Sequence, residues 1–260
     1  MKLPLLHITG TGQPFIWMHG MLNSVESDSL YSLLDFDQLS KLVSVIRYDT
    51  CDKSVSGDYS WDATTEELLQ VANAQNYQSM ILGGCSMGSG AAIHAAIRAP
   101  HKVKALVLIT PPPAWEKRAE VKTVYKKIVS RLHQNSIPEF LKRLIAQNQD
   151  PPEFYEREHP GTRQRLLEYR LSFDPGYYPK IYTGGAASDL PDREQIAGIN
   201  VPTLIVAHLN DPNHPLEMAQ EINSLIKGSE LVTVSDYQEY LKLQKKVSNF
   251  ISSVLSDNKS

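Results

Sequence analysis

Residues 80–92, MILGGCSMGSGAA, decide the fold of this chain. The apolar run Met80–Gly83 is typical of a buried strand, and the small residues after Ser86 are typical of a helix packed closely on a sheet. Gly84 and Gly88, two positions before and after the serine, remove the side chains that would collide across a sharp turn. The motif therefore predicts a strand–turn–helix unit, a nucleophile elbow, with the Ser86 hydroxyl projecting from the sheet edge.

Outward from this motif, short apolar runs alternate with amphipathic helical stretches. This alternation is typical of a parallel sheet covered on both faces by helices, because the strand runs are continuously apolar. We expect strands at Phe15–Met18, Leu42–Tyr48, Ser79–Gly83, Lys104–Ile109, Thr203–Ala207 and Leu231–Val234, after a further strand within residues 1–10. We expect helices from Asp62 or Thr64 to about Asn76, and at Met87–Arg98, Pro215–Ile226 and Tyr240–Leu255.

Residues 113–199 interrupt this alternation. They contain no clear strand and offer helices near Ala119–Leu132, Ile137–Gln147 and Thr162–Leu171. A structureless loop of that length is uncommon in a compact domain, so we expect a helical insertion. The predicted organisation is an α/β core of residues 1–112 and 200–260, with residues 113–199 as a helical cap over the active-site end of the sheet. The aromatic residues of this cap either contact a ligand or form its own small core.

The composition is that of an ordinary globular protein. The chain has 260 residues, 42% of them hydrophobic, and a formal net charge of −3, which gives no reason to expect nucleic acid or an anionic membrane as a partner. Basic residues between Lys117 and Arg131 are interspersed with apolar positions at helical spacing, so we expect them on a solvated helix face.

The apolar runs, cysteines and motifs of the sequence also give expectations about the partners and the cellular location of the protein. No stretch approaches the ~18 apolar residues of a membrane span, and the two cysteines, Cys51 and Cys85, fit a reducing compartment. Cys51 is a candidate exposed thiol in a loop. No metal-ligand spacing and no dinucleotide fingerprint is found. We expect a soluble cytoplasmic protein that acts on a small molecule without a metal or cofactor; the sequence does not predict its oligomeric state.

Two backbone N–H groups are candidate donors to a negatively charged oxygen near Ser86. The Met87 N–H lies at the predicted start of a helix, where the helix dipole favours negative charge. The Met21 N–H lies in the loop after the first buried strand. We expect these two groups to form an oxyanion hole. His19, in the same loop, is a candidate substrate contact and also a candidate for stabilising the loop.

The motifs together resemble the α/β-hydrolase superfamily. The resemblance rests on residues 17–20 (WMHG) and 47–49 (RYD), on the elbow, and on residues 101–112 and 201–215, in the family's order along the chain. It covers nearly the whole chain outside the proposed cap. It implies the α/β-hydrolase fold, with Ser86 as the nucleophile and Asp211 as the acid that orients a catalytic base.

The resemblance leaves that base unassigned. The family usually places a histidine after the last strand, but no histidine follows His214, and Tyr237 and Tyr240 stand where one is expected. Tyrosine, with an ordinary pKa near 10, is a poor base at neutral pH. Tyr237 and Tyr240 are therefore candidate substrate contacts, and His214, three residues after Asp211, is the candidate base. His208, or His133 or His159 from the cap, are alternatives.

The predicted function is hydrolysis of a carboxylic ester, thioester or lactone of a small apolar or aromatic substrate by a serine nucleophile. Two alternatives stay open because the base is uncertain, and losing a base costs many orders of magnitude in rate. One is a protein of the same fold that binds a ligand without catalysis. The other is a non-hydrolytic enzyme, such as a lyase or cyclase, on that fold.

Overall fold

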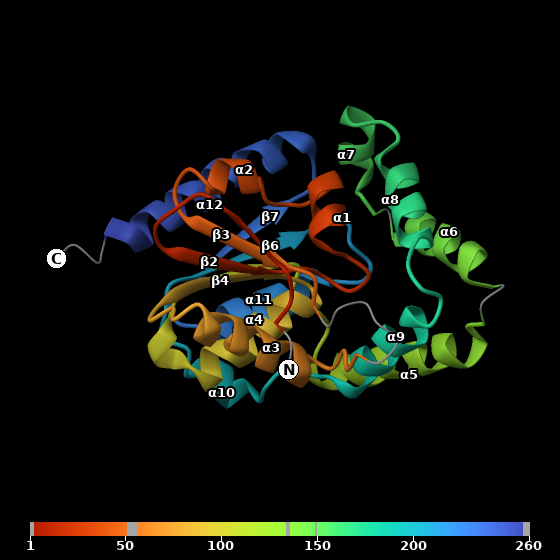
Figure 1. Cartoon of the computed structure of the whole chain (residues 1–260), viewed down its shortest axis with the longest axis horizontal. Helices are drawn as coiled ribbons and strands as arrows, with labels where there is room; N and C mark the ends of the chain where they lie inside the picture. Colours follow the sequence, from red (N-terminus) through yellow and green to blue (C-terminus); the bar gives the residue numbers. More distant parts are fainter. Residues whose placement is uncertain (1–2, 51–56, 134–135, 149, 257–260) are drawn as a thin grey trace.

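One sheet with helices on both faces forms the body of the molecule (Figure 1). The computed structural model describes residues 3–50, 57–133, 136–148 and 150–256, so Cys51 lies outside the described residues. Within these residues the seven strands lie in the order β1-β3-β2-β4-β5-β6-β7. They are β1 Leu6–Thr9, β2 Pro14–Met18, β3 Ser44–Tyr48, β4 Met80–Cys85, β5 Val103–Ile109, β6 Thr203–His208 and β7 Glu230–Val234.

The sheet is parallel apart from β1, which pairs antiparallel with β3. The predicted mostly parallel α/β sheet is therefore confirmed, and its predicted strands agree with the observed ones to within one or two residues. Because the strands are parallel, the loops after β2, β4 and β6 all leave from the same edge of the sheet. That edge is where Ser86, the His19–Ser24 loop and Asp211 come together.

Each face of the sheet is covered by a different set of helices. Side chains alternate between the faces, so that Leu82 packs into one core cluster and Ile81 into the other. The first cluster is completed by α3 Trp61–Ala74, α4 Met87–Arg98, α10 Arg193–Ala197 and α11 Leu216–Leu225. The second is completed by α2 Phe36–Leu39 and α12 Tyr237–Ser256. The short helix α1 Val25–Leu30 lies beside the second set (Figure 1).

Two helix starts differ from the prediction because of capping residues. Ser60, not Asp62 or Thr64, caps α3: its hydroxyl accepts the Ala63 N–H at 3.3 Å, whereas the Thr64 hydroxyl bonds back to a helix carbonyl. In the last helix, the Asp236 carboxylate accepts the Glu239 N–H at 2.9 Å, and α12 begins at Tyr237 rather than Tyr240.

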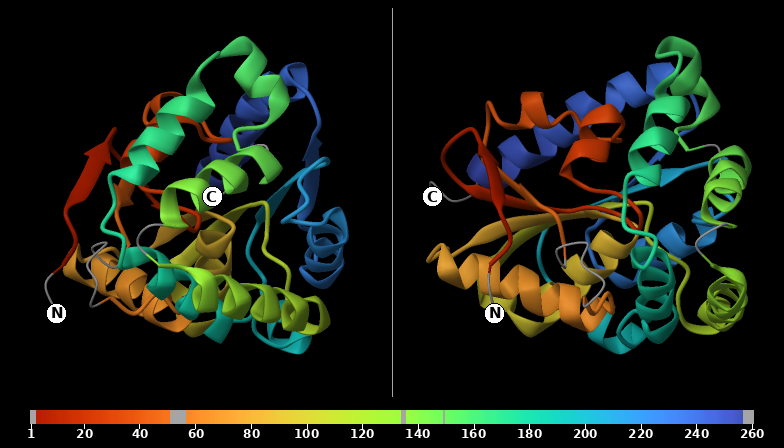
Figure 2. Two further views of the ribbon diagram at one scale, coloured as in Figure 1. Left: turned by 90° about the vertical axis from the view of Figure 1, so that its right-hand side faces the viewer. Right: turned by 45° about the vertical axis from the view of Figure 1, so that its right-hand side comes forward.

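Residues 113–187 form helices that gather at the side of the molecule where the parallel strands end (Figures 1 and 2). The three helices expected from the sequence are present, and α7 and α9 were not predicted. The helices are α5 Trp115–Arg131, α6 Ile137–Asn148, α7 Glu153–Glu158, α8 Thr162–Leu171 and α9 Tyr177–Ala187. The following helix α10 packs on α4 and α11 of the sheet layer.

Aromatic rings of these helices pack mainly on one another. Tyr177, Tyr178 and Tyr182 are buried, and the ring of Phe173 meets those of Tyr177 and Tyr178. Tyr125 of α5 packs edge-on against Tyr182 of α9, with ring centroids 5.1 Å apart. Most of these rings therefore form an internal core, one of the two outcomes that the sequence left open.

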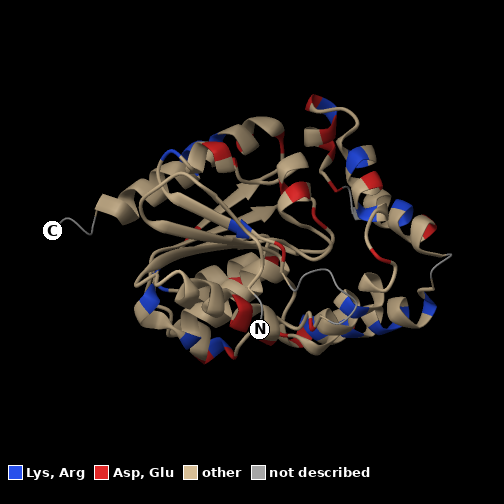
Figure 3. Ribbon diagram, in the orientation of Figure 1, with Lys and Arg blue, Asp and Glu red and all other residues tan. Residues whose placement is uncertain are grey.

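Figure 3 marks lysine and arginine positions along the ribbon of α5, and Lys117, Lys126, Lys127 and Arg131 are exposed, as expected for a solvated face. Arg118 is the exception, with only 2% of its surface exposed. Its guanidinium donates to the carbonyls of Ser188 and Gly185 at the end of α9 and lies 4.4 Å from the centre of the Trp61 ring. Helical spacing alone put Arg118 on the exposed side; the carbonyls at the end of α9 provide its buried partners.

In the described part of the chain, no helix combines the length and apolar character needed to cross a membrane.

Candidate active site

Ser86 lies at the turn between β4 and α4 in a strained backbone conformation. Its φ is 51°, a left-handed value that side chains rarely adopt, and its N–H is held by the Ile109 carbonyl at 3.0 Å. The turn requires glycine on both sides. A Cβ on Gly84 would lie 2.2 Å from the Gly88 carbonyl carbon, and one on Gly88 would lie 2.0 Å from the Met18 oxygen. The predicted strand–turn–helix elbow is present.

His214 bridges Ser86 and Asp211. Its Nε2 lies 2.7 Å from the Ser86 Oγ, and its Nδ1 lies 2.6 Å from the Asp211 Oδ2. Asp211 and His214 occupy the loop between β6 and α11, at the same sheet edge as the elbow. In the described residues, no other side chain is within hydrogen-bonding distance of the Ser86 hydroxyl. The structure thus brings together the three residues that the sequence nominated as nucleophile, acid and base.

The charge on Asp211 determines how this chain of hydrogen bonds is protonated. Burial raises the pKa of Asp211, but the charge and hydrogen bond of His214, the Asn213 N–H and His208 outweigh that effect and lower it below its usual value. Asp211 is therefore ionised at neutral pH and accepts a hydrogen bond from the Nδ1–H of His214. This tautomer leaves Nε2 as the acceptor of the Ser86 proton, the arrangement a general base needs.

The alternative histidines lie elsewhere. His208 packs against the Phe154 ring, and burial lowers its pKa. His159 hydrogen-bonds to the Tyr237 hydroxyl at 3.0 Å on an exposed surface, and His133 is exposed in the loop after α5. None of these three contacts Ser86.

His19 is buried and hydrogen-bonded to the main chain, which is the environment of a residue that stabilises a loop and not that of a substrate contact. It is 3% exposed, its Nδ1 lies 2.8 Å from the Gly20 carbonyl, and its Nε2 accepts the Thr50 N–H at 3.0 Å. Both ring nitrogens are therefore occupied by main-chain groups. The geometry favours the second interpretation of the sequence, in which His19 stabilises the loop after β2.

That loop passes directly over Ser86. A Cβ on Gly20 would lie only 3.7 Å from the Ser86 Cβ and 3.4 Å from the Cys85 carbonyl. Met21 follows at the next position, and Met87 is the first residue of α4, whose N–H has no partner within the helix. Met87 thus follows the serine directly in the chain, Met21 belongs to the loop beside it, and the helix dipole adds positive potential at Met87.

Tyr237 and Tyr240 belong to an aromatic cluster on α12 instead of replacing a histidine at the serine. Tyr240 packs against Phe154, Tyr155 and Tyr237, and burial raises its pKa. Neither hydroxyl hydrogen-bonds to Ser86 or His214. The helix α12 starts earlier than predicted and the Tyr237 hydroxyl hydrogen-bonds to His159, so a contact of Tyr237 or Tyr240 with substrate stays a prediction.

Cys85, beside the nucleophile in sequence, is not activated. Burial raises the pKa of its thiol to about 12, although the hydrogen bond with Thr110 partly offsets this. The thiol is protonated at neutral pH and packs beside β5. Within the described residues, no three His, Cys, Asp or Glu side chains are grouped to hold a metal ion.

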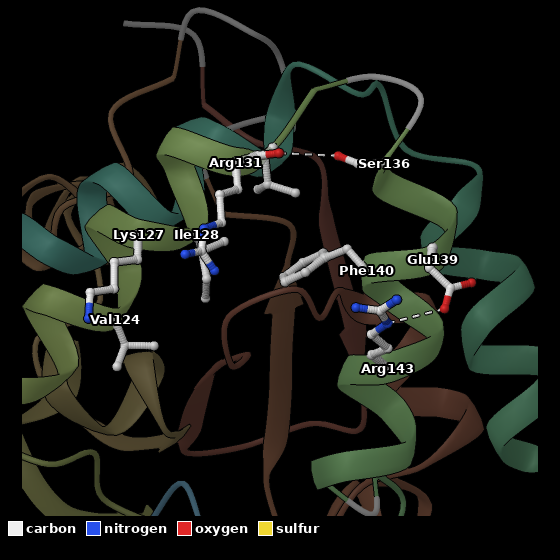
Figure 4. Close-up of a pocket in the computed structure, with 9 residues that line it drawn as sticks. Val124, Lys127, Ile128, Arg131, Ser136, Glu139, Phe140 and Arg143 are labelled. Carbon is white, nitrogen blue, oxygen red and sulfur yellow. Dashed lines mark hydrogen bonds and ion pairs between the residues drawn. The ribbon is translucent and has the colours of Figure 1, made fainter.

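A cavity of about 480 Å³ lies between α5 and α6 (Figure 4). Figure 4 shows the Phe140 ring pointing from α6 into this space, whose wall also includes Val124 and Ile128 of α5. Behind it, Phe140 packs on Tyr182 with centroids 5.7 Å apart. The cavity walls are largely apolar, with Lys127, Arg131 and Arg143 at its edges.

Sequence reasoning missed the residues that hold the loop after β2. Arg170 of α8 is 2% exposed and donates to the Asn23 side chain at 2.8 Å and to the Asp150 carboxylate at 2.6 Å. Tyr169 accepts a hydrogen bond from the Ser24 hydroxyl at 2.7 Å. No local motif marks these residues, because their partners in the loop after β2 are more than a hundred positions away in the chain.

A mostly parallel sheet with a serine at the elbow after a central strand defines the class of α/β-hydrolase-fold proteins. A family model for the alpha/beta hydrolase fold matches residues 44–246, and this chain belongs to that family.

Individual relatives agree with this assignment. The chain is 27% identical over 267 residues to the AB hydrolase superfamily protein YisY of Bacillus subtilis, covering 94% of this chain and 93% of that protein. It is 25% identical to a proline iminopeptidase of Heyndrickxia coagulans, covering 94% and 92% of the two chains. Among solved structures, a thermophilic esterase of Thermogutta terrifontis superimposes with a TM-score of 0.76 at 21% identity, covering 97% and 93% of the chains. At that identity the likeness concerns the fold.

Proposed function

We propose that this protein is a serine hydrolase that cleaves a carboxylic ester, thioester or lactone of a small apolar or aromatic substrate. The observation that carries the proposal is the position of the His214 ring, 2.7 Å from the Ser86 hydroxyl and 2.6 Å from the Asp211 carboxylate. A hydrogen-bonded serine, histidine and carboxylate is the arrangement that activates a hydroxyl nucleophile.

The first half-reaction transfers the acyl group to the enzyme. The Ser86 Oγ attacks the substrate carbonyl carbon while its proton passes to His214 Nε2. The carbonyl oxygen becomes an oxyanion, and the Met21 and Met87 N–H groups donate to it. When the tetrahedral intermediate collapses, the bond to the leaving oxygen or sulfur breaks, and His214 returns the proton to that atom.

The second half-reaction releases the acid. Water attacks the acyl-Ser86 carbonyl carbon and gives a proton to His214, the same N–H groups hold the second oxyanion, and collapse frees the carboxylic acid and restores Ser86. Asp211 remains ionised throughout, keeps the ring oriented and stabilises the imidazolium that forms twice in each cycle.

The substrate class is supported by the cavity between α5 and α6. Its apolar walls fit a hydrocarbon or aromatic group, and residues 113–199 serve in this proposal as a cap over the reacting carbonyl. Solved structures with the same fold include an esterase and an enol-lactonase of Burkholderia xenovorans LB400, the latter with a TM-score of 0.74 at 16% identity.

The triad is tested with a fluorophosphonate probe and with p-nitrophenyl butyrate. The probe should label the wild-type protein and not Ser86→Ala. His214→Gln should lose at least ~10³-fold in kcat, because among the described residues only His214 hydrogen-bonds to the Ser86 hydroxyl.

His159→Gln and His208→Gln are the matched controls and should keep near wild-type turnover. Activity that survives in His214→Gln and is lost in either control would assign the base elsewhere. A wild-type protein that resists the probe would instead support the ligand-binding alternative.

A further inference from the structure

Three side chains from the helices of residues 113–199 contact residues 22–24, in the loop after β2 that lies beside Ser86. Arg170 donates from Nη2 to the Asn23 amide oxygen at 2.8 Å and from Nε to the Leu22 carbonyl at 3.3 Å. Tyr169 accepts a hydrogen bond from the Ser24 hydroxyl at 2.7 Å, and the Leu22 backbone hydrogen-bonds to the Tyr177 hydroxyl. Residues 22–24 are thus held from outside at each position, immediately after the proposed donor residue.

The loop has a conformation that needs such support. Leu22 has a φ of 64°, a left-handed value that is unfavourable for a branched side chain. The turn is closed by a hydrogen bond from the Asn23 N–H to the Gly20 carbonyl at 3.1 Å. A strained turn persists only where surrounding contacts over-determine it.

Arg170 is the central member of these contacts. Only 2% of its surface is exposed, and its charge is balanced by the Asp150 carboxylate at 2.6 Å. The Tyr178 hydroxyl donates to the Arg170 carbonyl and anchors this part of α8 to α9. Burying a guanidinium is costly unless its donors find partners, and two of the acceptors of Arg170 belong to the loop.

We infer that Arg170 is a positioning residue, which fixes the Leu22–Asn23 turn and thereby keeps the Met21 N–H aimed at the oxyanion formed at Ser86. The inference rests on the proposed function. Because a residue of α8 holds the loop after β2 that carries Met21, the helices of residues 113–199 contribute to catalysis and also form a wall of the substrate site.

The expected signature is a loss in kcat with little change in KM. The Met21 N–H hydrogen bond strengthens only as negative charge develops on the carbonyl oxygen, so misplacing it weakens transition-state binding more than substrate binding. A displacement of about 1 Å in such a donor is enough to cost up to ~10²-fold in rate.

The test compares Arg170→Ala, Asn23→Ala and Arg118→Ala on p-nitrophenyl butyrate. Arg118 is the matched control, because it is equally buried and also donates to carbonyls of the helical segment but does not contact residues 22–24. We expect kcat to fall ~10- to 100-fold in Arg170→Ala and less in Asn23→Ala, with KM within about threefold of wild type. Added guanidinium ion should restore part of the kcat of Arg170→Ala.

A second readout isolates the oxyanion. A trifluoromethyl ketone adds to Ser86 to form a tetrahedral adduct, so its inhibition constant should rise in parallel with the loss of kcat/KM in Arg170→Ala and Asn23→Ala. Arg118→Ala should leave both quantities near wild type, whatever it costs in thermal stability.

Several results would overturn the inference. One is a folded Arg170→Ala with wild-type kcat and ketone affinity; if that variant fails to fold, an unchanged kcat in Asn23→Ala has the same force. Equal losses in Arg170→Ala and Arg118→Ala, without rescue by guanidinium, would reduce Arg170 to a structural role. If the hydrolase proposal itself failed, the fluorophosphonate would not label wild-type Ser86, and the inference about Arg170 would fail with it. Labelling of wild-type Ser86 therefore separates these results from a failure of the hydrolase proposal.

Discussion

His214 faces both Ser86 and Asp211 because one short turn carries both Asp211 and His214. The Asn213 N–H donates to the Asp211 Oδ1 at 2.8 Å, so this carboxylate folds back on its own backbone while its Oδ2 meets the His214 ring. Pro215 is the N-cap residue of α11. A histidine in a separate loop after β7 is not required, since a spacing of three residues already places the ring between the two oxygens.

Burial also shifts the pKa of Asp28 on α1. This shift predicts that the stability of the protein depends on pH. Burial raises the pKa of Asp28 from 3.8 to about 7, although the Trp17 hydrogen bond and the charge of Arg47 partly offset this. The folded-state pKa lies above the unfolded one, so the contribution of Asp28 to stability is fully present below pH 3.8 and is lost as the pH rises to about 7.

The substitution Asp28→Asn should remove this loss of stability at higher pH. The amide oxygen can still accept the Trp17 N–H, which lies 2.6 Å from the carboxylate, and it carries no charge to desolvate. Urea unfolding at pH 4, 6 and 8 should show the free energy of unfolding of the variant gaining on that of wild type by on the order of a few kcal/mol as the pH rises. Glu26→Gln, an exposed change on the same helix, is the control, and a pH-independent difference for Asp28→Asn would contradict the prediction.

At the scale of elements, the elbow depends on how closely α4 approaches β2. Gly88 lies against the main chain of Met18, so that no side chain fits between the helix and the strand. Since Ser86 directly precedes α4, any displacement of the helix also moves Ser86 relative to His214.

Gly88→Ala should therefore destabilise the protein and reduce activity together. Its Cβ would lie 2.0 Å from the Met18 oxygen, and relieving that clash should cost about 2 kcal/mol or more in unfolding free energy. Thermal unfolding and butyrate turnover measure the two effects. Gly198→Ala, whose Cβ would come no closer than 3.2 Å to a neighbouring oxygen, should change either much less. Comparable losses in the two variants would mean that the close approach at Gly88 is not the cause.

Elements with a strong local pattern could be predicted from the sequence, and the others could not. The strands and α4 were recovered because continuous apolar runs and an alanine-rich stretch bound by glycine have few other interpretations. The short helices α1, α2 and α7 were missed because a few residues carry too little periodicity. α9 was missed because its two central glycines, Gly184 and Gly185, disfavour a helix and are required instead by contacts with Tyr59 and Tyr125.

At the scale of the whole molecule, the helical segment lies beyond the carboxyl ends of the strands and contains the apolar cavity (Figures 2 and 4). The same helices reach the loop after β2, because a Cβ on Gly185 of α9 would meet both the Tyr125 ring and the Met21 Sδ.

Filling the cavity should change chain-length preference without affecting the chemistry. Val124→Trp adds a large ring to the cavity wall, whereas Lys126→Trp adds the same ring to an exposed position of α5 outside it. We expect KM for p-nitrophenyl octanoate to rise roughly threefold to tenfold in Val124→Trp only, with p-nitrophenyl acetate little changed in both. Equal KM values for octanoate in the two variants would place the acyl group elsewhere.

The sequence by itself determined the fold and the identity of the elbow, because strand runs, glycine positions and their order are properties of local segments. It also nominated Ser86, Asp211 and His214 as candidates. Only the tertiary structure decided which candidate base meets Ser86, and it showed that His19 and Tyr240 have other partners and that Arg170 bonds to the loop after β2. These are contacts between segments distant in the chain, and their geometry is set by the parallel sheet edge and by packing, which no local pattern encodes.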